Sequence, residues 1–246
     1  MPEAARAPRP AAAAAPLLAV RDLEGWYGES HVLHGVTFDV HDGEIVTLLG
    51  RNGAGKTTTL KAIMGILGKR RGSVAFGGRE LIGLPSRVIA RAGIALCPEE
   101  RGIFASLSVE ENLMLPPQVL PGGLSVERIY ELFPNLRERL RSQGTKLSGG
   151  EQQMLAIGRI LRTGAKLLLL DEPTEGLAPV IVQQIGRTIA QLKTEGFTIV
   201  LVEQNFHFAT SVADRHYVVE TGKVIDMIPN EDLDANIDKL HSYLGV

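Results

Sequence analysis

The segment "EIVTLLGRNGAGKTTTL", residues 44–60, decides the fold expected of this chain. It begins with a nearly continuous apolar run, which is typical of a strand covered on both faces. A glycine-rich turn follows, and helical spacing begins directly after it. A phosphate-binding loop has this order of strand, turn and helix. We therefore predict an α/β core with an anion site where this strand ends.

The turn itself fits the phosphate-loop pattern in full. Its glycines let consecutive backbone N–H groups face one centre, where they and the positive helix end would hold a β-phosphate. Lys56 offers a full charge to the β- and γ-phosphates, and Thr57 offers a hydroxyl to Mg²⁺. A chance glycine-rich turn is the alternative, with a frequency of about one per cent in a chain of this size. The predicted nucleotide-binding residues are Gly50, Arg51, Asn52, Gly53, Ala54, Gly55, Lys56, Thr57 and Thr58.

An acid pair, Asp171 and Glu172, follows the second apolar run, "LLLL" at residues 167–170. Ligands of open α/β sheets bind at the carboxyl ends of the strands. Asp171 is suited to hold Mg²⁺ through a water, because Mg²⁺ keeps much of its hydration shell. Glu172 is placed to orient or deprotonate an attacking water. An ordinary strand-end turn is the alternative, and the phosphate loop upstream disfavours it.

The rest of the chain alternates between strand and helix patterns, which predicts a single α/β domain over residues 17–246. Helical patterns dominate residues 100–164 and predict an inserted helical subdomain. The Ala/Pro-rich residues 1–16 predict a disordered tail, because they lack the apolar core of a targeting peptide. Further strands are predicted at residues 17–27, 36–40, 73–78, 93–98 and 198–204, with residues 28–32 as a turn.

Composition excludes several classes of protein. The formal charge is −2, which gives no sign of a large basic surface for nucleic acid. No apolar run approaches the roughly 18 residues of a membrane-spanning helix. The one cysteine, Cys97, cannot form an internal disulfide and favours a reducing compartment.

A second anion site is predicted at "GTKLSGGEQQML", residues 144–155. Ser148 and Glu151 have capping-box spacing, so a well-capped helix is the simplest interpretation. Capping does not explain Gly149 and Gly150, because glycine early in a helix costs up to about 1 kcal/mol relative to alanine. Glycine does let backbone N–H groups approach a ligand closely.

Together these motifs resemble those of the ATP-binding subunits of ABC transporters. Residues 50–58 resemble the Walker A loop, residues 167–173 the Walker B strand, and "LSGGEQ" at residues 147–152 the ABC signature. The resemblance implies a phosphate-loop NTPase core of ABC ATPase type with an N-terminal antiparallel β subdomain. It also implies ATP and Mg²⁺ as ligands. Two such domains pack head to tail in the family, so residues 148–151 would cap the γ-phosphate held by a second subunit.

Several further site residues follow from the resemblance. Tyr27 in "WYG" would stack on adenine, with Trp26 in reserve and a plain surface aromatic as the alternative. Glu99 replaces the family's usual Gln near Mg²⁺. Gln204 replaces the His that contacts the γ-phosphate, and it can donate a hydrogen bond but cannot carry a proton. His207 is a helix residue without a catalytic role in this interpretation.

Four short segments resemble one subgroup of this family more specifically. Pro98-Glu99, "EGLAP" (175–179), "VEQN" (202–205) and "SYLGV" (242–246) resemble one of the two ATPase subunits of branched-chain amino-acid importers. "EGLAP" has Ala178 where the family often has Asp. This resemblance implies a second ATPase subunit as partner, in a heterodimer or else a homodimer. It implies two transmembrane permease subunits, indirectly a substrate-binding protein, and a cytoplasmic position on the inner face of the plasma membrane.

Other functions remain open at this stage. A urea or amide importer and a lipopolysaccharide exporter have similar ATPases. A nucleotide-binding regulator without turnover would suit the missing His. An ABC ATPase acting on DNA or ribosomes is disfavoured, since the chain has no coiled coil, tandem domain or basic surface.

Overall fold

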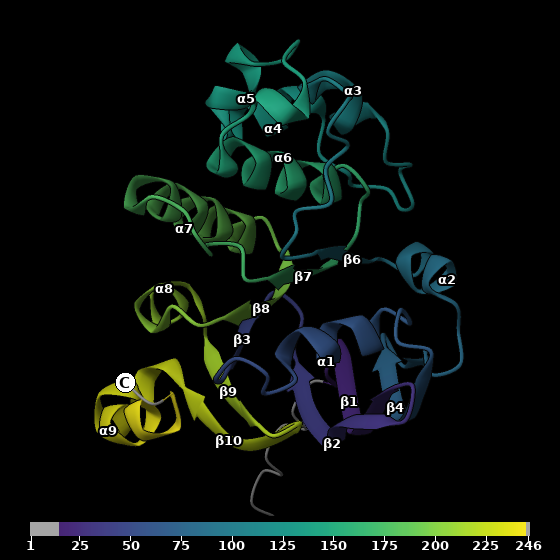
Figure 1. Cartoon of the computed structure of the whole chain (residues 1–246), viewed down its shortest axis with the longest axis vertical. Coiled ribbons are helices and arrows are strands. Elements are labelled where there is room, and N and C mark those ends of the chain that lie inside the picture. The colour runs from purple at the N-terminus through teal and green to yellow at the C-terminus, as the bar shows by residue number, and fades with distance from the viewer. Residues whose placement is uncertain (1–14, 245–246) are drawn as a thin grey trace, which may run out of the picture.

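The computed structural model describes residues 15–244, so nearly all of the tail predicted over residues 1–16 lies outside the described residues. The larger of two sheets runs through the middle of the molecule with helices above and below it, and the smaller sheet lies at the lower edge (Figure 1). No helix within residues 15–244 has both the length and the apolar character needed to cross a membrane. The mixed α/β class predicted from the sequence is confirmed.

The larger sheet is built around parallel strands. Its order is β10-β9-β3-β8-β7-β6, and only β10 runs antiparallel to its neighbour. Every residue of β3, β7 and β8 is buried, which explains why these strands have mostly apolar sequences. The bounds are β3 Ile45–Leu49, β6 Ile94–Cys97, β7 Leu167–Asp171, β8 Thr198–Glu203, β9 Arg215–Glu220 and β10 Lys223–Pro229.

The smaller sheet is antiparallel and comes mainly from the N-terminal part of the chain, as predicted. Its order is β2-β1-β4-β5. The turn predicted over residues 28–32 is wrong in length, because Ser30 already pairs with Tyr27 and His31 with Trp26. Gly28 has φ of +58°, which lets two residues close the hairpin. The bounds are β1 Leu18–Tyr27, β2 Ser30–Val40, β4 Lys69–Phe76 and β5 Arg79–Glu80.

Helices account for the remaining elements. Between β6 and β7 the structure has α3 to α6 and no named strand, and these helices form the upper part of Figure 1. The capping box predicted at Ser148 begins α6, and a second capping box at Ser108 begins α3. The bounds are α1 Lys56–Ile63, α2 Ser86–Arg91, α3 Val109–Met114, α4 Val126–Leu132, α5 Pro134–Glu138, α6 Gly149–Leu161, α7 Pro179–Thr194, α8 Phe206–Val212 and α9 Leu233–Leu244, with 3₁₀ turns at Gly144–Lys146 and Asn230–Asp232.

The larger sheet separates two hydrophobic cores. Alternate residues of one strand enter opposite cores, because side chains alternate across a sheet. In β7, Leu167 and Leu169 join the core shared with α1 and the smaller sheet. Leu168 and Leu170 join the core beneath α3 to α7. The sheet therefore holds the lower and upper parts of the molecule together.

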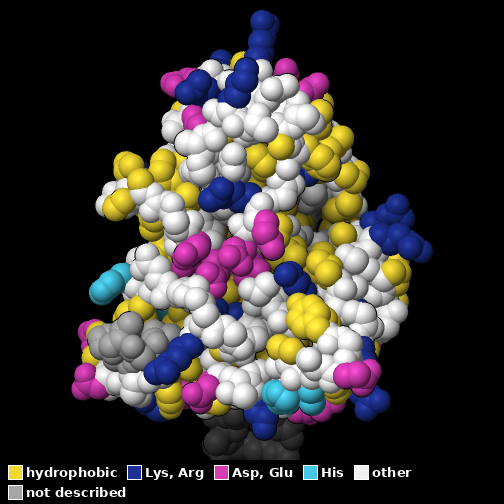
Figure 2. Space-filling view, in the orientation of Figure 1, with side chains coloured by type: hydrophobic (Ala, Val, Ile, Leu, Met, Phe, Trp, Pro, Cys, Tyr) yellow, Lys and Arg dark blue, Asp and Glu magenta, His cyan; other side chains and the backbone are white. Residues whose placement is uncertain are grey.

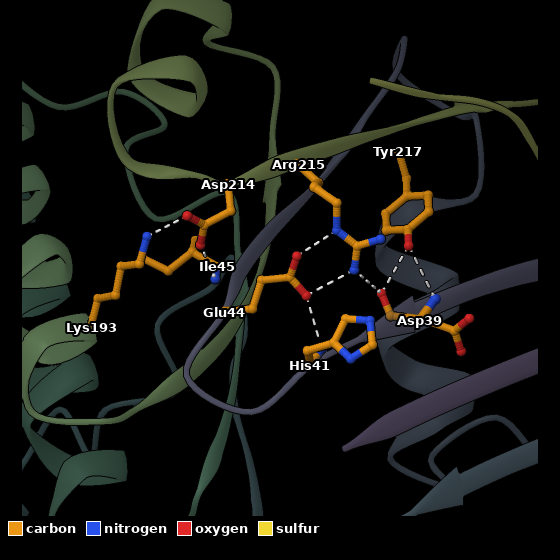
Figure 3. A network of polar contacts seen from close by, with 8 residues as sticks. All are labelled: Asp39, His41, Glu44, Ile45, Lys193, Asp214, Arg215 and Tyr217. Carbon is orange, nitrogen blue, oxygen red and sulfur yellow. Dashed lines mark hydrogen bonds and ion pairs between the residues drawn. The ribbon is translucent and has the colours of Figure 1, made fainter. Parts of the chain in front are cut away.

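A polar network fastens the two sheets to each other (Figure 3). Arg215 of β9 contacts both carboxylate oxygens of Glu44, and its guanidinium also donates to the Asp39 carbonyl at 3.2 Å. The Tyr217 hydroxyl donates to the same carbonyl at 2.9 Å. Asp214 accepts from the Ile45 backbone at 2.9 Å and pairs with a lysine of α7. The end of β2 and the start of β3 are thereby fixed.

We predict that Arg215→Ala lowers the free energy of unfolding by about 2 kcal/mol, since it leaves the mostly buried Glu44 without its cation. Urea unfolding at neutral pH measures this change. The control is Arg128→Ala, which removes an arginine from a more exposed cluster and should cost clearly less stability. Equal losses of unfolding free energy for the two variants would contradict the stabilising role given to Arg215.

Candidate nucleotide site

The loop between β3 and α1 has backbone conformations that suit glycine. Gly53 and Gly55 have φ of +79° and +104°, in the region that other residues rarely adopt. A Cβ on Gly50 would lie 2.2 Å from the carbonyl oxygen of Val219, which is too close for any side chain. The loop can therefore present backbone N–H groups toward a ligand, as the sequence predicts.

Lys56 lies inside this loop and is only 4% exposed. Its ammonium donates to the carbonyls of Gly50 and Arg51, at 2.8 and 3.1 Å. It also lies 3.7 Å from Glu172 Oε1. Burial lowers the pKa of Lys56, while the charges of Glu172, Asp171 and Glu203 oppose that shift. The Lys56 ammonium, which is predicted to contact the phosphates, is thus held at the loop.

Thr57 and Asp171 meet, as required of a shared cation site. The Thr57 hydroxyl donates to Asp171 Oδ1 at 2.9 Å. Asp171 is 1% exposed, and burial raises its pKa to about 6 despite that hydrogen bond. Two oxygen-bearing side chains at the pocket fit Mg²⁺, which takes few protein ligands beside waters and phosphates. Within residues 15–244 no cluster of three or more His, Cys, Asp or Glu could hold a metal alone.

Gln204 contacts the predicted base directly. Its side-chain amide donates to Glu172 Oε2 at 2.6 Å. Glu172 has φ of +46°, an uncommon conformation for a residue other than glycine, and its backbone N–H donates to the Val202 carbonyl at 2.9 Å. Such a conformation persists only where the surroundings enforce it. The strands therefore hold Glu172 in place from both its backbone and its side chain.

Lys56, Thr57, Glu172 and Gln204 line a cavity of about 360 Å³, whereas the buried Asp171 does not line it. Acidic side chains gather near the middle of this face of the molecule, beside α7 (Figure 2). Glu99 lines the cavity, as expected of a residue near Mg²⁺. Val32 and Glu175 also line it and were not predicted as site residues: no motif marks Val32, and Glu175 stood out only as the first residue of "EGLAP". Gly50 and Arg51 do not line it, and Arg51 faces a neighbouring cavity of about 250 Å³.

The two aromatic residues predicted for adenine differ in their surroundings. The Trp26 ring stacks on His31, with ring centroids 4.3 Å apart and planes 10° apart. Tyr27 is 48% exposed and does not line the cavity. Tyr27 is the freer of the two rings, and its role stays a prediction.

The signature segment lies away from this cavity. The Ser148 N–H donates to Glu151 Oε2 at 2.7 Å, and the Glu151 N–H to Ser148 Oγ at 3.3 Å. None of residues 148–151 lines the cavity of the phosphate loop. α6 lies above the larger sheet and α1 below it (Figure 1). Within one chain the two predicted anion sites are therefore separate.

Helix packing gives a second physical reason for glycine in the signature segment. A Cβ on Gly150 would lie 2.9 Å from Cγ2 of Ile181, on α7. Close packing of α6 against α7 thus requires glycine at this position. The nearest atom to a Cβ on Gly149 would be Nη2 of Arg101, at 3.3 Å, the movable end of a long side chain. Packing imposes no such requirement at Gly149, so backbone access to a ligand stays the predicted reason for glycine there.

A buried acid that the sequence analysis did not consider lies beside the site. Glu203 ends β8 and is 2% exposed. Its Oε1 accepts from the Thr174 hydroxyl at 2.7 Å and from the Thr174 N–H at 3.2 Å, and its Oε2 accepts from the Asn205 N–H at 3.2 Å. Burial raises the pKa of Glu203 to about 7. The sequence did carry one signal for Glu203, because it is an acidic residue at the end of an otherwise mostly apolar strand.

The raised pKa of Glu203 predicts a pH-dependent stability. Between pH 4.5 and about 7 the folded chain binds this proton more often than the unfolded chain does. Its contribution to stability is thus complete below pH 4.5 and lost as the pH rises toward 7, a fall of about 3 kcal/mol. Glu203→Gln cannot titrate and should lack this fall. Urea unfolding of both proteins from pH 4.5 to 8, without nucleotide, measures the difference, and parallel curves would contradict it.

Comparison with known proteins places this geometry in a family. A family model described as ABC transporter matches residues 33–175. The high-affinity branched-chain amino acid transport ATP-binding protein BraG of Pseudomonas aeruginosa is 45% identical over 238 residues, which are 93% of this chain and all of that protein. The lipopolysaccharide export system ATP-binding protein LptB of Escherichia coli is 37% identical over 93% of this chain and 97% of its own.

Solved structures agree with this placement. One described as the ATP-binding subunit of an ABC transporter is 31% identical, with a TM-score of 0.78, and covers 94% of this chain and all of its own. A nucleotide-free ATP-binding cassette, 22% identical and with a TM-score of 0.79, shares the fold over 94% of this chain. With the loop, the acid pair and the signature segment all present, the chain belongs to the ABC transporter family, as one of its ATPases.

Proposed function

We propose that this chain hydrolyses ATP to power the uptake of branched-chain amino acids, or of related small amides or carboxylates, through an ABC importer. The observation that carries the proposal is the 45% identity with BraG, which extends over 93% of this chain. A second relative, named as a probable branched-chain amino acid transport ATP-binding protein, LivF of Archaeoglobus fulgidus, is 37% identical over 82% of this chain.

Lipopolysaccharide export is the alternative function that a comparison favours. The identity with LptB is 37% over the same share of the chain, against 45% for BraG. A urea or amide importer is a further alternative within uptake. Substrate choice would rest with the binding protein and the permease subunits, so affinity purification from membranes, with identification of the co-purified binding protein and its ligand, separates these functions.

In the proposed reaction Glu172 positions a water for attack on the γ-phosphate and takes its proton. Lys56 meets the charge that develops on the phosphoryl oxygens. Mg²⁺, held by Thr57 and Asp171 with Glu99 nearby, would neutralise phosphate charge when bound. Gln204 holds the Glu172 side chain through the 2.6 Å hydrogen bond, and it cannot itself exchange a proton.

A complete site needs a second subunit in this proposal. The phosphate loop has its own cavity, and residues 148–151 do not line it. Ser148 and the start of α6 would therefore cap the nucleotide bound by a partner ATPase, packed head to tail. A sister chain that carries the switch His would make this a heterodimer.

Two features support a link between the site and membrane subunits. Arg101, two residues after Glu99, donates to Gln152 of α6 at 3.1 Å, so the loop that follows β6 is fastened to the signature helix. Phe104, Met114 and Leu115 are large exposed apolar side chains in the same region. We propose that permease subunits contact this surface, with the chain on the inner, cytoplasmic face of the plasma membrane.

Glu172→Gln tests the assignment of the base. The variant keeps the side-chain shape, so it should bind ATP normally while turnover falls by about 10²–10⁴-fold. The dimer should then stay closed when ATP is added. Phosphate release, ATP titration and size-exclusion chromatography with ATP measure these effects. Glu231→Gln, an exposed substitution in the turn before α9, is the control, and near-normal turnover of Glu172→Gln would remove Glu172 from the role.

The heterodimer can be tested with the purified chain. We expect the chain alone to dimerise weakly with ATP and to hydrolyse it slowly, because both composite sites would carry Gln204. Addition of the sister ATPase should raise turnover and produce a stable mixed dimer. Sedimentation with ATP and an ATPase assay measure both, and a tight, fully active homodimer would contradict the proposal.

A further inference from the structure

We propose that Glu203 is a positioning residue for hydrolysis. Its carboxylate ties the segment after β7 to the segment after β8, and this tie keeps the Gln204 amide on Glu172. The inference rests on the proposed role of Glu172 as the base. Glu203 would touch neither the nucleotide nor the water, and it would act through Thr174 and Asn205.

Strand pairing brings the two segments to the same edge of the sheet. β7 and β8 are parallel neighbours, and Asp171 pairs with Val202 in register. The chain therefore leaves both strands at one edge, with Glu172 on one segment and Gln204 on the other. A backbone hydrogen bond of 2.9 Å from the Glu172 N–H to the Val202 carbonyl extends this pairing by one residue. Beyond it, the hydrogen bonds that the structure describes between the two segments involve side chains.

The Glu203 carboxylate divides its two oxygens between these segments. Oε1 takes both the hydroxyl and the N–H of Thr174, two residues after Glu172. Oε2 takes the N–H of Asn205, the residue after Gln204. One buried group thus holds both segments on either side of the 2.6 Å bond between Gln204 and Glu172.

A buried carboxylate is a costly way to fill the end of a strand. Burial disfavours its charged form, and the like charge of Glu172 adds to that effect. An apolar residue would avoid this cost, but it would leave Thr174 and Asn205 without their acceptor. The acid does what an apolar residue cannot do, because it joins two separate segments through short, directional hydrogen bonds.

The expected consequence concerns the rate rather than nucleotide binding. The Lys56 ammonium is held at the phosphate loop by the carbonyls of Gly50 and Arg51, outside this clamp, whereas the orientation of Glu172 depends on the clamp. Misplacement of a catalytic group by about 1 Å can cost up to about 10²-fold in rate. Loss of the clamp should therefore lower kcat and leave KM for ATP and the Kd of ATP nearly unchanged.

Thr174→Val is the primary test, because it removes the hydroxyl and keeps the shape of the side chain. We expect kcat to fall about tenfold, with KM and the Kd of ATP within about twofold of wild type. Thr174→Ser restores a hydroxyl and should recover kcat to within about threefold. The matched control is Thr188→Val, a buried threonine of α7 whose hydroxyl bonds only to the Gln184 carbonyl of its own helix.

Assays at 25 °C, with thermal unfolding of each variant in parallel, separate positioning from stability. Thr188→Val should lower Tm without lowering kcat. Glu203→Gln, which loses one acceptor atom, should lower kcat in the same direction as Thr174→Val. The inference is overturned if Thr174→Val and Glu203→Gln turn over ATP as fast as Thr188→Val, or if Thr174→Ser is as slow as Thr174→Val.

Failure of the inference can be told apart from failure of the proposed role of Glu172. Glu172→Gln is measured in the same assay. If it turns over ATP normally, Glu172 is not the base and the premise fails. If it is inactive while Thr174→Val and Glu203→Gln match the control, Glu172 keeps its role and Glu203 loses the role proposed for it.

Discussion

The parallel pairing of β3, β8 and β7 is the constraint on which the site depends. These three buried strands end at one edge of the sheet, in adjacent positions and in fixed register. The phosphate loop follows the first strand, Gln204 the second and the acid pair the third. Thr57 and Asp171, which are 114 positions apart, therefore meet within hydrogen-bonding distance, and so do Glu172 and Gln204. Burial of the strands on both faces keeps that edge rigid.

Charge balance at this edge sets what the cavity can accept. Lys56 is the buried cation, and the charges of Asp171, Glu172 and Glu203 all act on it. Glu99 and Glu175 add further negative charge to the cavity wall. A bare polyphosphate would meet considerable repulsion from so many carboxylates. The surplus of acid favours a nucleotide accompanied by a divalent cation, and the Thr57–Asp171 contact offers the oxygen atoms for it.

The same rigidity keeps the two predicted anion sites of one chain apart. The phosphate loop belongs to the lower core, whereas the start of α6 packs on α7 in the upper core. Gly150 makes that packing close, and Arg101 fastens the loop after β6 to the same helix. A motion of the upper helices would thus carry the signature turn and the exposed apolar surface together, which suits transmission between a partner's nucleotide and membrane subunits.

The sequence by itself determined the features that are local in the chain. The phosphate loop, the capping boxes at Ser108 and Ser148, and the acids after a buried strand depend on residues a few positions apart, so their patterns can be read directly. Only the tertiary structure decided contacts between distant segments: Gln204 on Glu172, Glu203 between Thr174 and Asn205, Glu175 in the cavity wall, and Gly150 against Ile181. The physical reason is that strand register and helix packing set these distances. The spacing of residues within one motif determines neither of them.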